Sequence, residues 1–286
     1  LDSGGAWTLF WIAGAIAFLV SLYMFSIGRT RIRVRQYRIG DTESKPDLRI
    51  SALSDLHLGE YVSAEHIRQA VEISNRLTPD IVLLLGDYVD RDGSLAAELL
   101  DELTHLKANI GVYAVLGNHD VAASNSQLVI DAFESDANIS LLKNTSTGIS
   151  IDTPNGARNL ELLGIESPDE WWQIEHNDAI ELTIQKAIKE SESDFRIVAS
   201  HHPDVVELCA QYDIDLVVAG HTHGGQLAVP FGGPFLNAGR LAVKYLWKQY
   251  EINNTKLIVT PGVGVGILPA RIGVPPEVTL IELSFD

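Results

Sequence analysis

The main pattern in this chain is a set of five apolar segments that each end in polar residues. The segments have the length of buried strands, and the residues after them are of the types that bind metal ions. They are residues 50–53 before Asp55 and His57, 81–85 before Asp87, 112–116 before Gly117-Asn118-His119-Asp120, 195–199 before His201 and His202, and 214–219 before His221 and His223. Because sites in open α/β sheets lie beyond the carboxyl ends of the strands, we expect these clusters to converge on one edge.

Helical periodicity separates these segments. Ser63 is a candidate N-cap for a helix that places Ile67, Ala70 and Val71 on one face and ends before Pro79. Further helices are expected at about residues 94–106, 126–135, 178–190 and 204–212. Strands are expected within residues 139–163 and at 257–260 and 278–283. Alternation of strands and helices that gives way to strands predicts a layered α/β core rather than a purely doubly wound sheet.

The N-terminal segment has a different character. Residues 3–28 carry no charge, and residues 7–27 are almost wholly apolar, with Trp7, Trp11 and Tyr23 toward the ends. A helix of that length spans roughly 31 Å, about the thickness of a hydrocarbon core. The acidic start does not suit a secretory signal. We expect an uncleaved transmembrane helix, with a buried core helix as the alternative, and we expect further sequence upstream because the chain begins with Leu.

A basic flank follows the apolar segment and contains Arg29, Arg31, Arg33, Arg35 and Arg38. Positive flanks stay in the cytoplasm, which would place the rest of the chain there. Arginine at every second position also suits a strand with one face toward anionic lipid head groups. A plain stop-transfer flank on an edge strand is an equal alternative. The expected parts are an anchor (1–28), a basic strand and linker (29–47) and a folded domain (48–286).

The charge and the cysteine count limit the classes of partner and the compartment that we expect for this chain. The formal net charge is −17, although the basic flank is positive, so the folded domain is strongly acidic and would repel nucleic acid phosphates. Nucleic acid is therefore not an expected partner. Cys209 is the one cysteine, which excludes an intrachain disulfide and permits a reducing compartment. We expect its thiol to be buried and inert.

The polar clusters offer donors for metal ions. Asp55 with His57, and His221 with His223, are two residues apart, so each pair can project to one side of extended chain. Asp87 can bridge two ions. A mixture of carboxylate or amide oxygens with several imidazoles suits paired borderline cations such as Mn²⁺, Fe or Zn²⁺ better than Ca²⁺. Three other histidines, His66, His105 and His176, lie in polar or helical stretches and are expected at the surface.

In this order, the motifs resemble those of the calcineurin-like metallophosphoesterases over residues 48–283. They are Asp55-x-His57, Gly86-Asp87-x-x-Asp90, Gly117-Asn118-His119-Asp120, His201 and Gly220-His221-x-His223. The resemblance implies a four-layer αββα sandwich of two mixed sheets, here preceded by the transmembrane helix. It also implies a metal-dependent phosphoric ester hydrolase with two divalent ions. Mn²⁺ is expected, with Fe, Zn²⁺ and Mg²⁺ as alternatives.

The resemblance also assigns roles by position. One ion would be held by Asp55, His57, Asp87 and His223, and the other by Asp87, Asn118, His201 and His221. His119 would contact the scissile phosphate or the leaving oxygen and would be oriented by Asp120. A ligand set with His202 in place of His201 is the less favoured alternative, and Asp90 is expected to support its loop. Two cations would lower the pKa of a bridging water, and the resulting hydroxide would attack phosphorus in line.

A narrower resemblance concerns the substrate. Gly220-His221-Thr222-His223-Gly224-Gly225-Gln226, Leu268-Pro269-Ala270-Arg271 and Pro275-Pro276-Glu277 resemble a bacterial branch that includes UDP-2,3-diacylglucosamine pyrophosphatases. The sequence departs from that branch at Trp171-Trp172 and in residues 231–250. We expect a phosphodiester or pyrophosphate bond in a lipid-linked substrate, cleaved at the cytoplasmic face of the inner membrane. The alternatives are a soluble nucleotide or phosphomonoester, and a non-catalytic binding protein on the same fold.

Overall fold

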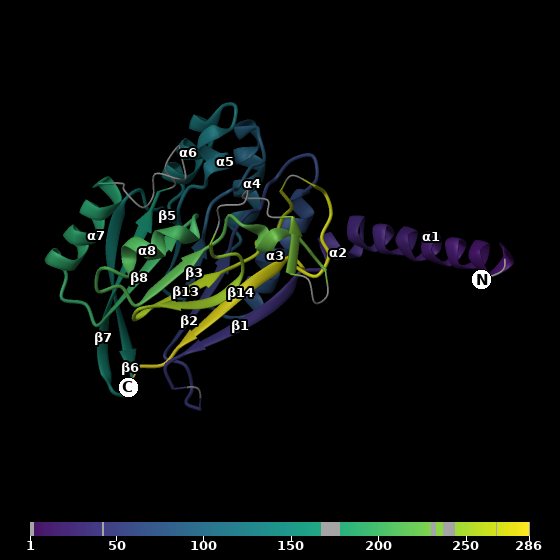
Figure 1. The fold of residues 1–286 in the computed structure, drawn as a ribbon. Coiled ribbons are helices and arrows are strands. Elements are labelled where there is room, and N and C mark those ends of the chain that lie inside the picture. The colour runs from purple at the N-terminus through teal and green to yellow at the C-terminus, as the bar shows by residue number, and fades with distance from the viewer. Residues whose placement is uncertain are drawn as a thin grey trace.

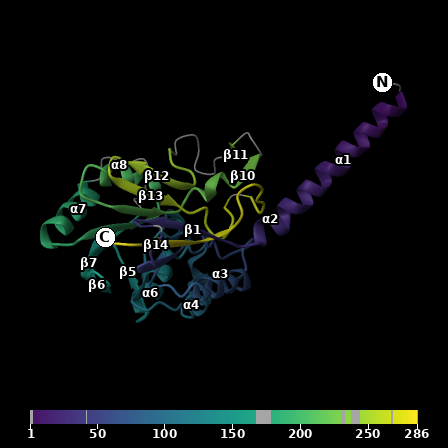
Figure 2. The same cartoon turned by 90° about the horizontal axis from the view of Figure 1, so that it is seen from below.

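The fold is a sandwich of two six-stranded sheets covered by helices on both outer faces (Figures 1 and 2). The computed structural model describes residues 3–41, 43–166, 178–229, 233–236, 244–266 and 268–285. The helices are α1 (Ser3–Phe25), α2 (Ile27–Thr30), α3 (Ala64–Arg76), α4 (Ala96–Leu103), α5 (Asn118–Ala122), α6 (Ser126–Ser135), α7 (Asp178–Glu190) and α8 (Val206–Cys209).

Both sheets are mixed. The first has the order β1 (Arg33–Ile39), β14 (Glu277–Leu283), β2 (Leu48–Leu53), β3 (Ile81–Leu84), β4 (Gly111–Ala114) and β5 (Ile139–Leu141). The second has the order β12 (Lys248–Ile252), β13 (Thr255–Val259), β9 (Leu216–Ala219), β8 (Phe195–Ser200), β7 (Gly156–Ile165) and β6 (Thr145–Thr153). In the first sheet β14 runs antiparallel to β2, and in the second β12 and β6 run antiparallel to their neighbours. A separate hairpin joins β10 (Leu227–Val229) to β11 (Gly233–Leu236).

Alternation along the strands divides the core into layers. In β3, Ile81 and Leu83 pack between the two sheets, whereas Val82 and Leu84 pack against α3, α4 and α6. The outer face of the second sheet packs against α7 and α8 in the same way. Because side chains of a strand alternate between its two faces, each sheet can bury one face in the common core and one beneath helices. The expected αββα sandwich is therefore confirmed.

The predicted helices are present, α6 and α7 with the expected bounds and α4 with shorter ones. Ser63 caps α3 as expected, because its side chain accepts a hydrogen bond from the backbone N–H of His66. The segment expected to be helical at 204–212 is a 3₁₀ turn (Pro203–Val205) followed by the single turn of α8. Cys209 in α8 is buried, and burial raises the pKa of its thiol to about 12, as suits an inert core residue.

The N-terminal helix stands away from the body (Figures 1 and 2). Among the described residues, Trp7–Thr30 is the one segment long and apolar enough to cross a membrane, with a mean hydropathy of 2.0. Its most apolar 18 residues are unburied, whereas Gly28 near its end is buried against the body. The backbone N–H of Arg271 donates to the carbonyl of Met24 at 3.1 Å, and Nη1 of Arg29 donates to the carbonyl of Tyr61 at 2.7 Å. The end of the apolar segment is therefore fixed to the body by hydrogen bonds.

The basic flank continues into the first sheet as β1, which pairs with β14 in parallel. Arg35 forms an ion pair with Glu277 at 2.9 Å, and Arg38 forms one with Glu282 at 3.0 Å. These two arginines therefore neutralise acids of the neighbouring strand. The proposed lipid-facing role can apply to Arg29, Arg31 and Arg33. The three-part division of the chain stays a prediction, with the addition that β1 is a strand of the first sheet.

We predict that Arg35→Ala destabilises the fold by about 1–3 kcal/mol, because it leaves the carboxylate of Glu277 buried without its ion-pair partner. It also removes the guanidinium that lies 4.6 Å from the ring centroid of Trp247. The measurement is the urea unfolding curve of the full chain in detergent. Arg33→Ala is the matched control, since Arg33 is an exposed residue of the same strand, and should change the stability by less than about 0.5 kcal/mol. Equal effects of the two variants would contradict the role of the pair.

Candidate metal centre

The metal centre is built at the carboxyl ends of strands from both sheets. Asp55 and His57 follow β2, Asp87 follows β3, and Asn118 begins α5 after β4. From the second sheet, His201 and His202 follow β8, while His221 and His223 follow β9. The expected convergence is therefore observed, and strands of both sheets supply donors to the centre.

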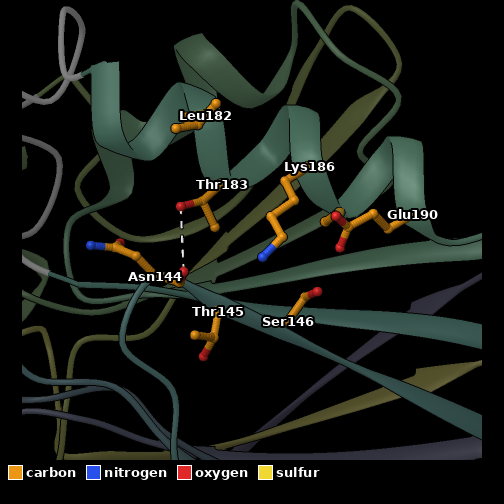
Figure 3. Close-up of a pocket in the computed structure, with 8 residues that line it drawn as sticks. Asn144, Thr145, Ser146, Leu182, Thr183, Lys186 and Glu190 are labelled. Atoms are coloured by element: carbon orange, nitrogen blue, oxygen red, sulfur yellow. Dashed lines mark hydrogen bonds between the residues drawn. The ribbon is translucent and has the colours of Figure 1, made fainter.

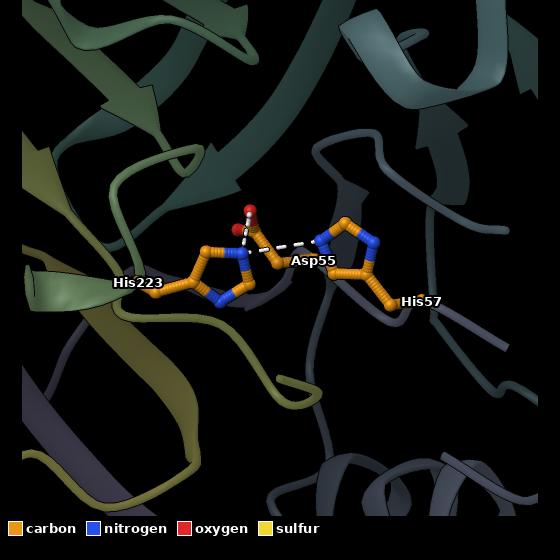
Figure 4. Close-up of side chains that lie close together, drawn as sticks. All are labelled: Asp55, His57 and His223. Carbon is orange, nitrogen blue, oxygen red and sulfur yellow. Dashed lines mark hydrogen bonds and ion pairs between the residues drawn. The ribbon is translucent and has the colours of Figure 1, made fainter. Parts of the chain in front are cut away.

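A first group of donors consists of Asp55, His57 and His223 (Figure 4). The Nε2 atoms of His57 and His223 lie 3.1 Å apart, and Nε2 of His223 lies 3.5 Å from Oδ1 of Asp55. Burial lowers the pKa of His57 to about 3, so this ring is neutral at pH 7. Two imidazole nitrogens and a carboxylate oxygen that face one another in a buried space form a suitable set of ligands for a cation.

A second group consists of Asp87, His201 and His221. Nε2 of His201 lies 3.2 Å from Nδ1 of His221 and 3.2 Å from Oδ2 of Asp87. The same oxygen of Asp87 lies 3.5 Å from Nε2 of His57, which belongs to the first group. Asp87 therefore lies between the two groups, in the position that a ligand shared by two ions would occupy.

The ring of His201 is oriented for binding through Nε2. Its Nδ1 lies 2.7 Å from the backbone carbonyl of Leu85, which can only accept, so Nδ1 carries a proton. Burial disfavours the charged ring, but the carboxylate of Asp87 outweighs this and raises the pKa of His201 to about 9. A proton on Nε2 of His201 therefore faces the carboxylate of Asp87 at the position where a metal ion would bind both groups.

Two buried oxygens support a fit between these residues and metal ions. Within the described part of the chain, Oδ1 of Asp55 and Oδ1 of Asn118 are buried and have no hydrogen-bond partner. An unsatisfied buried oxygen costs free energy unless a ligand is bound. Asn118 itself lies between Gly117 and His119, both of which touch Asp87. The donor set, the facing nitrogens and these oxygens therefore fit two divalent ions.

Backbone strain is concentrated at the same place. Eleven described non-glycine residues have a positive φ, and five of them are expected ligands: Asp55, His57, Asp87, His221 and His223. Such conformations cost free energy and persist where the surrounding structure imposes them, as it does at functional sites. Close approach also requires glycine, because a Cβ on Gly117 would lie 2.2 Å from Oδ1 of Asp87.

His119 lies at the edge of the centre, and its side chain is 38% exposed. Its backbone N–H donates to Oδ1 of Asp87 at 2.8 Å, and its Nδ1 lies 2.7 Å from the backbone carbonyl of Asp90. Because a carbonyl only accepts, Nδ1 carries the proton and Nε2 is the atom left for chemistry. His57, Asp90 and His119 also form a third cluster of donors, but the bond to the Asp90 carbonyl engages Nδ1 of His119.

Asp120 has a different task from the one expected. Its carboxylate accepts hydrogen bonds from the backbone N–H groups of Asp87, Tyr88 and Gly117 at 2.7–2.8 Å. The side chain is completely buried and joins the turns after β3 and β4. The backbone carbonyl of Asp90 orients His119 instead, and the expected support of its loop by Asp90 stays a prediction. Asp120 therefore acts on the shape of the centre through the backbone that carries Asp87.

His202 is buried beside the second group. Its ring centroid lies 3.9 Å from that of His221, at an interplanar angle of 50°. The cluster of donors around Asp87 contains His201 and not His202. The geometry therefore favours His201 as the ligand and gives His202 a packing contact with the ring of His221.

Arg271 is a buried residue beside the centre that donor spacing alone did not find. It is fully buried, and its guanidinium donates to the backbone carbonyls of Pro261 and Gly264 at 2.7 and 2.6 Å. Its Nη2 lies 3.3 Å from Nδ1 of His223. The signal in the sequence was the motif Leu268-Pro269-Ala270-Arg271. The pair Trp171-Trp172, expected near substrate entry, lies outside the described residues, as does part of 231–250.

Comparison with known proteins agrees with this geometry. The family model described as calcineurin-like phosphoesterase matches residues 48–225. The chain belongs to this family. It is similar to phosphodiesterase YaeI of Escherichia coli, with 34% identity over 240 residues that cover 82% of each protein. The metallophosphoesterase YkuE of Bacillus subtilis is 27% identical over 82% of this chain and 79% of its own length.

A vertebrate relative extends the comparison. A zebrafish protein named transmembrane protein with metallophosphoesterase domain is 28% identical over 85% of this chain, which spans 54% of that protein. Family membership makes this chain a metal-dependent phosphoesterase. The two donor groups agree with the use of two metal ions, as the resemblance implied.

We predict that this phosphoesterase binds about two equivalents of divalent metal and that Asp87→Ala loses both, because Asp87 contacts donors of both groups. The measurement is the metal content of the purified full chain by mass spectrometry. Asp101→Ala removes an exposed acid of α4 and should retain both equivalents. Full metal content and activity in Asp87→Ala would rule out the bridging assignment.

We predict that His119→Ala retains its metals but loses roughly 10²–10⁴-fold in kcat, the range for a positioned general acid. The reason is that His119 lies beside the donor groups with Nε2 left for proton transfer. The measurements are the steady-state rate and the metal content of the same sample. His105→Ala removes an exposed histidine near the end of α4 and serves as the control. Loss of metal in His119→Ala would make it a ligand instead.

Proposed function

We propose that this phosphoesterase hydrolyses a phosphodiester or pyrophosphate bond in a lipid-linked substrate at a membrane surface. Under this proposal α1 is a single transmembrane anchor, and the catalytic body lies on the cytoplasmic side of a bacterial inner membrane. UDP-2,3-diacylglucosamine is the model substrate. The observation that carries the proposal is the direct contact between the end of the apolar helix and a residue that braces the metal centre.

That contact involves both parts of Arg271. Its backbone N–H binds the carbonyl of Met24 in α1, and a Cβ on Gly28 would lie 2.2 Å from its carbonyl oxygen. Its guanidinium lies against His223 of the first donor group. A helix that ends at the bilayer surface would therefore hold the metal centre close to that surface, where the reacting bond of an amphiphile lies. A freely diffusing substrate does not require this proximity.

The proposed side of the membrane rests on charge. Arg29, Arg31 and Arg33 follow the apolar segment directly, and positive flanks stay in the cytoplasm. The name of the zebrafish relative as a transmembrane protein supports an anchor of this kind. YaeI, as a bacterial phosphodiesterase, supports the reaction class.

The chemistry is divided among the residues of the centre. We assign one ion to Asp55, His57, Asp87 and His223, and the other to Asp87, Asn118, His201 and His221. Two bound ions, proposed as Mn²⁺ with Fe, Zn²⁺ and Mg²⁺ as alternatives, would supply an acidified water and neutralise phosphoryl charge. His119 keeps its Nδ1 proton on the Asp90 carbonyl and presents Nε2 to the leaving oxygen. Asp120 holds the turns that position Asp87 and Gly117.

The test compares kcat/KM for UDP-2,3-diacylglucosamine in mixed vesicles with that for a water-soluble aryl phosphodiester. The full chain is compared with a truncation that lacks residues 1–22, which retains Met24 and the whole of β1. We expect the truncation to lose about 10²-fold on the lipid substrate, since anchoring raises the effective concentration at the surface, and to keep its rate on the soluble ester. Equal efficiency on both substrates, unaffected by truncation, would instead favour a soluble nucleotide or phosphomonoester.

A further inference from the structure

Two cavities outside the metal centre differ in their place relative to the apolar helix. One, of about 270 Å³, lies between α7 and β6 (Figure 3). It contains Lys186 and Glu190 from successive turns of α7 and lies away from the apolar helix. The other, of about 280 Å³, lies where α2 meets the body, and we call it the anchor-foot cavity. It is lined by Arg29, Thr30, Gly59, Glu60, Tyr61, Val62, Ser63, His66 and Val265.

The position of the anchor-foot cavity suits a membrane lipid. Arg29 and Thr30 are the last residues of the segment long enough to span a membrane, and both line the cavity. In Figures 1 and 2, α2 lies between α1 and the body. If α1 spans the bilayer, the end of the span lies at the depth of the lipid head groups. The cavity would then open among those head groups.

The chemistry of the cavity suits a phosphate. Arg29 is held in place, because its Nε donates to the carbonyl of Phe25 at 2.8 Å and its Nη1 donates to that of Tyr61 at 2.7 Å. No carboxylate of the described chain forms an ion pair with it, whereas Arg35 and Arg38 are both paired. A guanidinium with a fixed plane and no ion-pair partner is a preferred partner of phosphate oxygens.

Ser63 adds a hydroxyl on the other side of the cavity. Its Oγ accepts the N–H of His66 at the start of α3, which leaves the hydroxyl proton available for donation. Glu60 also lines the cavity, and its carboxylate would repel an anion there. Glu60 and Arg29 form no ion pair, so the donors of the guanidinium that the two carbonyls leave unused remain available to a phosphate.

We propose that the anchor-foot cavity binds the phosphate of an anionic phospholipid head group, with Arg29 as its cation and Ser63 as a hydroxyl donor. The proposal rests on the proposed anchoring and not on the proposed substrate. The cavity is distinct from the metal centre, because the segment 263–266 separates them. On one side Val265 lines the cavity, and on the other a Cβ on Gly266 would lie 3.0 Å from Nε2 of His223.

Occupancy of this cavity would set the orientation of the body on the membrane. A single spanning helix leaves the body free to rotate about the helix axis, whereas a lipid contact beside it favours one rotational position. His66, which lines the cavity, is bonded to the segment 263–266, since its Nε2 donates to the carbonyl of Val263 at 3.0 Å. The backbone N–H of Gly264 in turn donates to the carbonyl of Asp55 at 2.7 Å. A bound head group would therefore contact the outer side of a wall of the metal centre.

The experiment uses the full chain in nanodiscs of phosphatidylcholine with and without phosphatidylglycerol. Lipid retained after release into detergent is identified by native mass spectrometry, and affinity is obtained by titrating phosphatidylglycerol. We expect selective retention of phosphatidylglycerol by the wild-type chain. Arg29→Ala should weaken its affinity about tenfold, because a charge-assisted contact is lost. Arg33→Ala, which removes an exposed arginine of the same flank outside the cavity, should retain the wild-type affinity.

Glu60→Gln keeps the experiment decisive if Arg29→Ala loosens the anchor. It removes the repelling carboxylate and should tighten phosphatidylglycerol binding by about two- to fivefold. Equal losses in Arg29→Ala and Arg33→Ala, or no effect of Arg29→Ala and Glu60→Gln, would overturn the proposal in favour of diffuse attraction or none.

Two further arms separate the sources of failure. Inorganic phosphate is titrated into the phosphatidylcholine nanodiscs, and binding of phosphate without selection of phosphatidylglycerol would assign the cavity to a soluble anion. Flotation of the wild-type chain with liposomes tests the anchor itself, and a chain that does not float would overturn the anchoring and this proposal together. Failure to hydrolyse a lipid-linked ester would affect only the proposed substrate, because lipid retention is measured without turnover.

Discussion

The structure depends on one electrostatic constraint, which is the burial of Asp87 among the ionisable side chains of the metal centre. Asp87 and Asp55 are both buried, and burial raises the pKa of Asp55 to about 6. Carboxylates that are removed from water are stable when a positive charge compensates them. Among the surrounding histidines, His201 carries a proton that faces Asp87, whereas burial lowers the pKa values of His57 and His221 to about 3 and leaves them neutral. Divalent ions would supply the missing charge, and the positive φ angles and close glycines exist to bring these donors together.

A second set of contacts transmits this constraint to the N-terminal helix. Arg271 is completely buried, a costly state for a guanidinium, and burial lowers its pKa to about 10. Backbone carbonyls of the 261–264 segment satisfy most of its donors. The same residue contacts His223 through its side chain and Met24 through its backbone. Because Arg271 contacts both the metal centre and α1, the end of α1 is part of the body and not the start of a flexible tether.

Features that depend on the local pattern of residues could be predicted from the sequence. Apolar segments followed by metal-binding residue types predicted the strand ends, and the order of motifs predicted the sandwich through resemblance to a family. Three features were not accessible in this way. The pairing of β1 with β14 joins residues at opposite ends of the chain, so no local pattern encodes it. The bonds of Asp120 go to the backbone, which spacing of side chains does not reveal. The burial of Arg271 depends on a loop whose path is set by tertiary contacts.

The origin of the donors has a consequence for how the sandwich is held together. Asp55, His57 and Asp87 belong to the first sheet, whereas His201, His221 and His223 belong to the second. Each donor group contains members from both sheets, so each ion would join the two halves of the fold. A ligand that binds the folded state and not the unfolded chain stabilises the fold in proportion to its affinity and concentration. The core between the two sheets is apolar, and apolar contacts do not by themselves fix the position of one sheet on the other. The donor groups would fix that position at the edge where the metal centre lies. Metal binding and correct packing of the two sheets are therefore coupled in this phosphoesterase.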